Sequence, residues 1–201
     1  MACRTSTRPK RGFVVNNSHV TLIPLEDDDR EQFIRDNQEA FLFEATQEFG
    51  VRDEHFEKDG QIISRATIEA SIDGEHAEAY RIWAHGEKAG GLVLSIDPKT
   101  LRGELDLLFV SPHTHSRGVG QAAWWCVEAL HPEVRVWELV TPYFERRNIH
   151  FYVNKLGFHI VEYFCDHHPD PHDTQEYTGE GDGGGMFRFE KVMRGDTPAD
   201  K

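Results

Sequence analysis

The spacing of the apolar residues changes part-way along the chain, and this change restricts the fold more than any other feature of the sequence. Three short apolar segments come first, at residues 79–85, 90–96 and 104–110. Gly86 and the stretch from Pro98 to Gly103 separate them. Short apolar segments bounded by Gly and Pro are typical of strands joined by hairpin connections. This part of the sequence therefore predicts an antiparallel meander.

A helix is predicted soon after the meander, because the apolar residues now recur every three or four positions. They are Val119, Ala122, Ala123, Cys126, Ala129 and Leu130. His131 and Pro132 end this stripe, since a residue before proline disfavours helical backbone. Cys126 lies within the stripe, so we expect it to be a small buried hydrophobic residue.

The remaining segments complete an order in which strands and helices follow one another. Strands are predicted at 19–25, 134–140, 158–164 and 186–193, and helices at 27–45, 64–71 and 146–156. The last helix has Gly157 as its C-cap. This order predicts an α/β fold of the α+β kind, with a central, mostly antiparallel mixed sheet flanked by helices. We interpret residues 1–17 as a flexible tail and residues 18–195 as a single domain.

The formal net charge of -13 limits the partners of the protein. A nucleic-acid-binding protein needs a basic surface, so no nucleic-acid partner is expected. Acidic groups can concentrate a cationic substrate, and solubility alone is the other explanation of the charge. No apolar run approaches the roughly 20 residues that span a bilayer, so we expect a soluble, cytoplasmic protein with no membrane partner. Three cysteines without a Cys-x-x-Cys pair predict reduced thiols.

A glycine pair opens the helix that follows the meander. The segment runs His115-Ser116-Arg117-Gly118-Val119-Gly120, directly after the strand that ends at Val110 and the short connection that follows it. Glycines at a helix start let backbone N–H groups approach an anion, and the helix dipole favours negative charge there. The pair predicts a pyrophosphate site, while a tight turn or close packing would explain the same glycines.

A second motif stands about thirty residues further on, past one predicted strand: Phe151-Tyr152-Val153-Asn154-Lys155-Leu156-Gly157-Phe158. Together the two motifs resemble the GNAT family of N-acetyltransferases. In that family a Gln/Arg-x-x-Gly-x-Gly/Ala loop binds the coenzyme A pyrophosphate, and a later helix ends in Phe-Tyr-x-x-x-Leu-Gly-Phe. The resemblance covers about residues 104–164, and the preceding strands have a compatible order.

The resemblance implies the GNAT-like acyl-CoA N-acyltransferase fold and an enzyme that transfers an acetyl group from acetyl-CoA to a primary amine of a small molecule or peptide. The amine would attack the thioester directly in a ternary complex, so no metal and no nucleophilic Ser or Cys is expected. The residues that it assigns to the cofactor are Leu108, Phe109, Val110, His115, Arg117, Gly118, Val119, Gly120 and Asn148. Backbone N–H groups near the first three would stabilise the tetrahedral oxyanion.

Three further residues receive roles in catalysis or acceptor binding. The resemblance implies that Tyr152 donates a proton to the departing thiolate, the alternative being a core-packing role. Glu104 stands where histone-type members of the family carry the general base, and a solvated strand carboxylate is the alternative. Asp106 is a candidate contact to the acceptor amine, because even spacing predicts that it shares a strand face with Glu104.

Two positions depart from the family pattern. His115 stands where the family has Gln or Arg, and Glu145 stands where the family often has Asn. These departures keep a second function open, namely a non-catalytic GNAT-like regulatory module that binds acyl-CoA. Tyr152 and Glu104 favour the enzyme.

The polar segment between residues 165 and 185 contains the run Asp166-His167-His168-Pro169-Asp170-Pro171-His172-Asp173. Its imidazoles and carboxylates are ligand types for zinc or nickel. A loop flanked by Pro and Gly rarely holds a fixed ligand geometry, so we expect a surface loop near the acceptor cleft and no metal site. If the protein forms an oligomer, a homodimer is the expected assembly, because dimers are the commonest among soluble oligomers.

Overall fold

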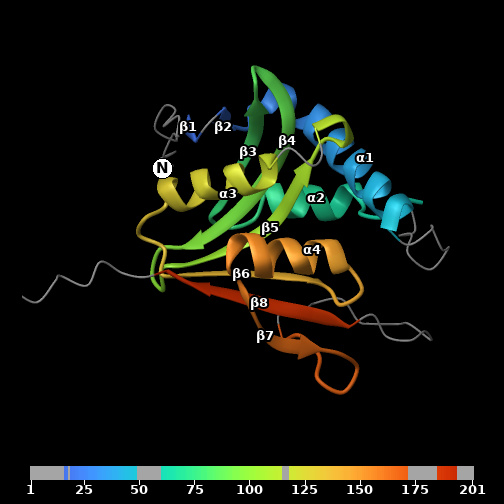
Figure 1. Cartoon of the computed structure of the whole chain (residues 1–201), viewed down its shortest axis with the longest axis vertical. Coiled ribbons are helices and arrows are strands. Elements are labelled where there is room, and N and C mark those ends of the chain that lie inside the picture. Colours follow the sequence, from blue (N-terminus) through green and yellow to red (C-terminus); the bar gives the residue numbers. More distant parts are fainter. Residues whose placement is uncertain (1–15, 18, 49–59, 115–117, 172–184, 194–201) are drawn as a thin grey trace, which may run out of the picture.

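The computed structural model describes residues 16–17, 19–48, 60–114, 118–171 and 185–193. These residues form one sheet of eight strands in the order β1-β2-β3-β4-β5-β6-β8-β7 (Figure 1). The strands are β1 (Asn16–Asn17), β2 (Val20–Pro24), β3 (Ala77–Ala84), β4 (Glu87–Asp97), β5 (Arg102–Val110), β6 (Val136–Pro142), β7 (His159–Phe164) and β8 (Met186–Val192). Neighbouring strands are antiparallel except β5 and β6, which are parallel.

Helices cover both faces of this sheet. The helical elements are η1 (Asp27–Asp29), α1 (Arg30–Glu48), α2 (Arg65–Ile72), η3 (Pro112–Thr114), α3 (Val119–Leu130), α4 (Arg146–His150) and the π-helix η4 (Phe151–Leu156). Figure 1 shows α3 and α4 on the near face and α1 and α2 on the far face. The resulting mixed sheet flanked by helices is the predicted fold.

Two hydrophobic cores hold these layers together. The core under α3 includes Trp124 and Trp137, whose rings meet edge to face with centroids 5.2 Å apart. Cys126 is fully buried in the same core, as predicted. The core under α1 and α2 includes Phe33 and Phe109, also edge to face at 5.1 Å. Such aromatic pairs contribute about 0.5–1.5 kcal/mol beyond their buried area.

The start of α1 is fixed to the sheet by a buried cation. The Arg81 side chain on β3 is only 3% exposed, and it donates to Asp29 in η1 and to Asp36 in α1 at 2.7 and 2.8 Å. Its guanidinium also lies over the Phe33 ring, 5.1 Å from the centroid. Removing one partner of such a buried pair is costly, because the other charge stays buried. This anchor holds η1 and the first turns of α1 against β3.

Most predicted elements are confirmed, with shifts of a few residues at their ends. The predicted helix 64–71 is α2, and Ser64 caps it by accepting a hydrogen bond from the Thr67 N–H at 3.1 Å. The predicted tail includes Asn16 and Asn17, which pair with β2 as strand β1. The predicted helix 146–156, with Gly157 as its C-cap, is confirmed, and its second half is a π-helix.

Strands β5 and β6 diverge, and this divergence positions the site. Their parallel pairing is limited to residues 102–104 of β5 and 136–138 of β6. Beyond Glu104, β5 continues upward to Val110 while β6 runs across the molecule (Figure 1). A parallel pair that separates leaves a split between two strands of the sheet, with α3 on one side of it. Among the described residues, no helix is long and apolar enough to cross a membrane.

Candidate active site

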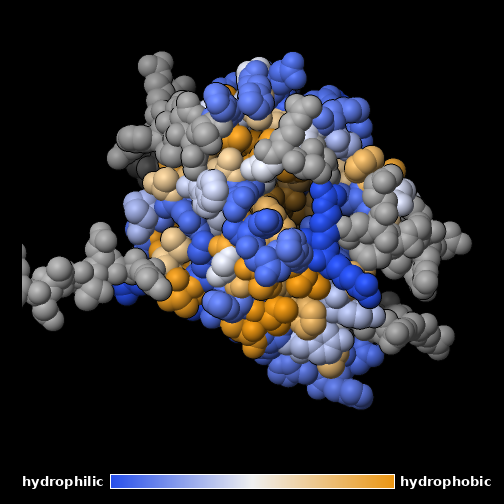
Figure 2. Space-filling model, in the orientation of Figure 1, coloured by the Kyte–Doolittle hydropathy of each residue, from blue (hydrophilic) through white to orange (hydrophobic). Residues whose placement is uncertain are grey.

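A cavity of about 230 Å³ lies beside the split, between the end of β5, the start of α3 and the helix formed by α4 and η4. Figure 2 shows this hollow, with hydrophobic residues at its floor and hydrophilic residues at its rim. It is lined by Glu44, Leu108, Val110, Thr114, Gly118, Val119, Gly120, Gln121, Arg147, Asn148, Phe151, Tyr152 and Lys155. The two sequence motifs therefore meet in one place.

The start of α3 forms one wall of the cavity. Gly118 has φ +73°, a left-handed conformation that side chains disfavour, and it is the N-cap of the helix. A Cβ added at Gly120 would lie 3.2 Å from the Phe151 ring, so a side chain there would have to displace that ring or enter the cavity. The Ala122 N–H donates to the Gly118 carbonyl at 3.0 Å. The first N–H groups of a helix have no acceptor within the helix itself, so the start of this 12-residue helix, at the positive end of its dipole, suits an anion.

The π-helix forms the opposite wall. The π-helix ends at Gly157, which caps it with φ +79°. There the N–H groups of Gly157 and Phe158 both donate to the Tyr152 carbonyl. Short π-helical turns occur frequently at functional sites. The Tyr152 ring packs against Phe158 and Phe189, with centroids 6.1 and 5.8 Å away, and Tyr152 also lines the cavity. The tyrosine is thus both a packing residue and a cavity residue.

The Tyr152 hydroxyl is held in its neutral form. Burial raises its pKa well above the ordinary value, and the negative charges of Glu145 and Glu44 raise it further. A tyrosine in this environment keeps its proton across the neutral range. It can therefore donate a hydrogen bond to a negative atom in the cavity.

The rim of the cavity carries charges of both signs. Arg147 and Lys155 come from the α4–η4 helix, and Glu44 comes from α1. Arg147 lies 3.9 Å from Glu44, an ion pair between the helices on the two faces of the sheet. With the start of α3, the two cations suit an extended anionic ligand. These residues fit a phosphate-bearing donor such as acetyl-CoA.

A β-bulge interrupts β5 where the split begins. Leu105 pairs with Leu94 and Leu107 pairs with Val93, so Asp106 is the extra residue. Leu105 joins the core under α3, whereas Leu107 joins the core under α1. The alternation that predicts a shared face for Glu104 and Asp106 is broken here.

The two carboxylates still interact, but they differ in environment. Asp106 is half-buried, and desolvation together with the nearby charge of Glu104 raises its pKa to about 7. Glu104 is exposed. A carboxyl group whose pKa lies near neutral pH has the property of a general base, and this property belongs to Asp106.

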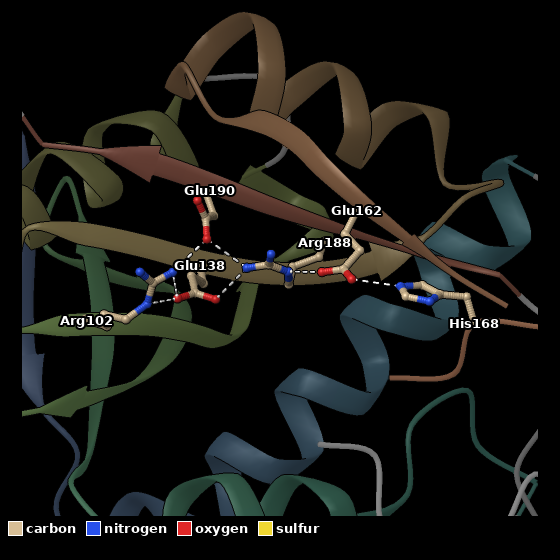
Figure 3. Close-up of polar contacts among 6 residues, drawn as sticks. All are labelled: Arg102, Glu138, Glu162, His168, Arg188 and Glu190. Carbon is tan, nitrogen blue, oxygen red and sulfur yellow. Dashed lines mark hydrogen bonds and ion pairs between the residues drawn. The ribbon is translucent and has the colours of Figure 1, made fainter. Parts of the chain in front are cut away.

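The sheet face that points away from α3 carries a network of charges (Figure 3). Arg188 on β8 donates to Glu138 at 3.0 Å, to Glu190 at 2.8 Å and to Glu162 at 2.9 Å. Arg102 on β5 bonds Glu138 and Glu190, and His168 bonds Glu162. The network joins β5, β6, β8 and β7 beside the exposed Glu104. Acidic side chains outnumber arginines in it, which favours cations near this face.

Comparison with known proteins agrees with this geometry. The family model described as the acetyltransferase (GNAT) family matches residues 24–158. The chain belongs to the GNAT family of acetyltransferases. A Bacillus subtilis (strain 168) protein named as the uncharacterised protein YrkN is 39% identical over 186 residues, which cover 89% of this chain and 96% of that protein.

Solved structures show the same fold at lower sequence identity. The ribosomal-protein-S18-alanine N-acetyltransferase of Escherichia coli has a TM-score of 0.60 and 17% identity, covering 89% of this chain and 97% of its own. The spermidine N-acetyltransferase of Vibrio cholerae, in complex with CoA and spermine, has a TM-score of 0.59 and 14% identity, covering 88% and 96%.

The residues predicted for the GNAT site divide into four groups. Those that line the cavity are Leu108, Val110, Gly118, Val119, Gly120, Asn148 and Tyr152. The Phe109 side chain does not, because it faces Phe33 in the other core. Glu104 and Asp106 lie at the start of the split, outside the cavity. His115 and Arg117 lie outside the described residues.

Several cavity residues are missed by the sequence analysis. Arg147 and Lys155 lie within the predicted helix 146–156, and their basic charge was the available signal. Glu44 has no such signal, because it reaches the cavity only through the path of α1 across the sheet. The structure describes the histidine-rich run as far as Pro171. At the start of the run, Cys165 and His168 form an isolated antiparallel β-bridge. Within the described residues no three His, Cys, Asp or Glu side chains are grouped to hold a metal ion.

Proposed function

We propose that this GNAT protein transfers an acetyl group from acetyl-CoA to a primary amine of a small molecule or peptide, by direct attack in a ternary complex. The observation that carries the proposal is the cavity at the start of α3, which opens beside the split between β5 and β6. An anionic donor suits the N–H groups of α3 and the side chains of Arg147 and Lys155. Acetyl-CoA is the donor that this charge pattern supports.

The acceptor amine would approach from the other side of the split. That side carries Glu104 and the network around Glu138 and Glu190, so it favours an ammonium group over an anion. A cationic acceptor is also consistent with relatives of the same fold, one of which is a spermidine acetyltransferase. The acceptor class is therefore an amine that is cationic before reaction.

The acid–base roles follow from the two environments. An ammonium must lose a proton before its nitrogen attacks the thioester carbonyl. We assign the role of general base, which accepts this proton, to Asp106 rather than to Glu104, because the pKa of Asp106 is raised to about 7. The leaving sulfur then gains a hydrogen bond or proton from Tyr152, whose hydroxyl stays protonated. Backbone N–H groups of β5 near Leu108 are the candidates for stabilising the oxyanion.

The experiment is a screen of amines with acetyl-CoA, measuring the free thiol released and the acetylated product by mass spectrometry. We expect amine-dependent thiol release at neutral pH. The set of acceptors includes diamines, polyamines and short peptides with a free N-terminus. Binding of acetyl-CoA without thiol release for every amine would favour the alternative of a non-catalytic acyl-CoA-binding module.

A further inference from the structure

The residue just before α4 makes a hydrogen-bond arrangement that the proposed chemistry does not use. The Glu145 carboxylate accepts from the Thr141 hydroxyl at 2.9 Å and from the Asn148 side-chain amide at 2.5 Å, both through Oε2. Thr141 is buried at the end of β6. Glu145 therefore connects a fixed point on the sheet with the first turn of α4.

Asn148 lines the cavity, whereas Glu145 is not among the cavity residues. An amide side chain has an NH₂ group and a carbonyl oxygen, and only the NH₂ group can donate to a carboxylate. The bond to Glu145 therefore fixes which way round the Asn148 amide lies. Its oxygen and its second N–H remain for other partners.

The same carboxylate acts on the tyrosine in the next turn. After burial, the Glu145 charge is the largest cause of the raised Tyr152 pKa. A free carboxylate beside an anionic donor would repel it, but here Glu145 receives two hydrogen bonds that offset part of its charge. The arrangement keeps Glu145 directed at the protein rather than at the cavity.

We propose that Glu145 is a positioning residue, which holds the Asn148 amide in the orientation that bonds a polar group of the bound coenzyme A donor. This inference rests on the proposed function, since it needs the donor to occupy the cavity. Asn148 touches the donor, and Glu145 acts through Asn148. Thr141 fixes Glu145 from the sheet.

The test is a double-mutant cycle on coenzyme A affinity, measured by calorimetry without any acceptor. The variants are Glu145→Ala, Asn148→Ala and the double variant, with Glu145→Gln as the conservative change. Each alanine variant should weaken coenzyme A binding by about tenfold, the size of one lost hydrogen bond to a charged or polar partner. The double variant should be no weaker than either single variant, because both remove the same contact.

The controls separate positioning from folding. Glu145→Gln keeps an acceptor oxygen for Thr141 and Asn148, so it should retain most of the coenzyme A affinity that Glu145→Ala loses. If Glu145→Ala does not fold, Thr141→Val provides the second route, with a smaller loss of affinity. Full additivity of the two alanine changes, or a lower Tm with an unchanged Kd, would overturn the inference. No coenzyme A binding by the parent protein would overturn the proposed function as well.

Discussion

The two sides of the sheet at β5 and β6 have opposite chemistry. On the α3 side, the cavity is formed by apolar strand residues, by the glycine-rich start of a helix, and by Arg147 and Lys155 at its rim. On the other side, the strands carry Glu104 and the network of Glu138, Glu190 and Arg188. The difference teaches that one split between strands can serve an anionic and a cationic substrate from opposite sides.

This separation depends on one local feature. The bulge at Asp106 lets Leu105 and Leu108 both face the α3 side, although an uninterrupted strand would place them on opposite faces. It also leaves Asp106 half-buried at the start of the split. The bulge thus lies where the two sides meet.

The largest expected effect is the loss of coenzyme A binding on the α3 side, which is the proposed donor side. In Gly120→Glu, a charged side chain must displace the Phe151 ring or enter the cavity, and its carboxylate repels phosphate. The increase in Tm that coenzyme A gives the parent should disappear, because stabilisation requires binding to the native state. Differential scanning fluorimetry measures this.

Ala66→Glu is the matched control for that variant. It adds the same side chain at an exposed position of α2. It should keep the coenzyme A shift. An intact shift in Gly120→Glu would contradict the assignment of the donor to this cavity.

The next effect concerns proton donation inside the cavity. Tyr152→Phe removes only a hydroxyl, so donor affinity should change little while kcat falls by roughly 10²–10⁴-fold, the usual range for general acid catalysis. Tyr143→Phe, on an exposed tyrosine, should leave kcat unchanged. An unchanged kcat in Tyr152→Phe, under conditions where the chemical step limits the rate, would leave Tyr152 with its packing role alone.

The sequence predicts the donor side better than the acceptor side, for physical reasons. Gly118, Gly120, Tyr152 and Gly157 have local signals, because helix starts and caps depend on the residues nearest in the chain. The bulge at Asp106 has no comparable signal, since it depends on the register of β4 against β5.

The sequence also does not predict contacts between elements that lie far apart in the chain. Glu44 lines the cavity from α1, and Arg81 anchors the start of this helix on β3 through contacts across 45 to 52 residues of sequence. The network around Arg188 depends on the order of β6, β8 and β7. The sequence predicts a helix over residues 146–156, but its residue pattern does not distinguish a π-helix from an α-helix.

The third prediction uses stability to test the half-buried carboxyl group. Since the pKa of Asp106 is raised from 3.8 to about 7, the folded state holds an extra proton between these values, and stability falls as pH rises through this window. Asp106→Asn should remove this fall, worth about 2 kcal/mol after allowing for partial exposure. Tm measured from pH 4 to 8 tests it. The parent and Asp106→Asn would have parallel profiles if the pKa of Asp106 were ordinary.

The smallest effect is expected on the charged face. Arg188→Met removes the cation that Glu138, Glu162 and Glu190 share, and Tm should fall by about 2–4 °C, as for one modest interaction in a domain of this size. Arg135→Met, on an exposed arginine, should have no effect. A fall that persists unchanged in 1 M salt would point to lost packing instead of lost ion pairs.

The most direct test of the two-sided account is kcat/KM against pH for the parent, Asp106→Asn and Glu104→Gln with one validated amine. The parent should lose activity below about pH 7, the value to which the pKa of Asp106 is raised. Asp106→Asn should be slow at neutral pH and recover as pH rises, because more amine arrives deprotonated. Glu104→Gln should keep the acidic limb, shifted to lower pH by the loss of its charge. A parent-like profile in Asp106→Asn, with the limb lost in Glu104→Gln, would contradict the account.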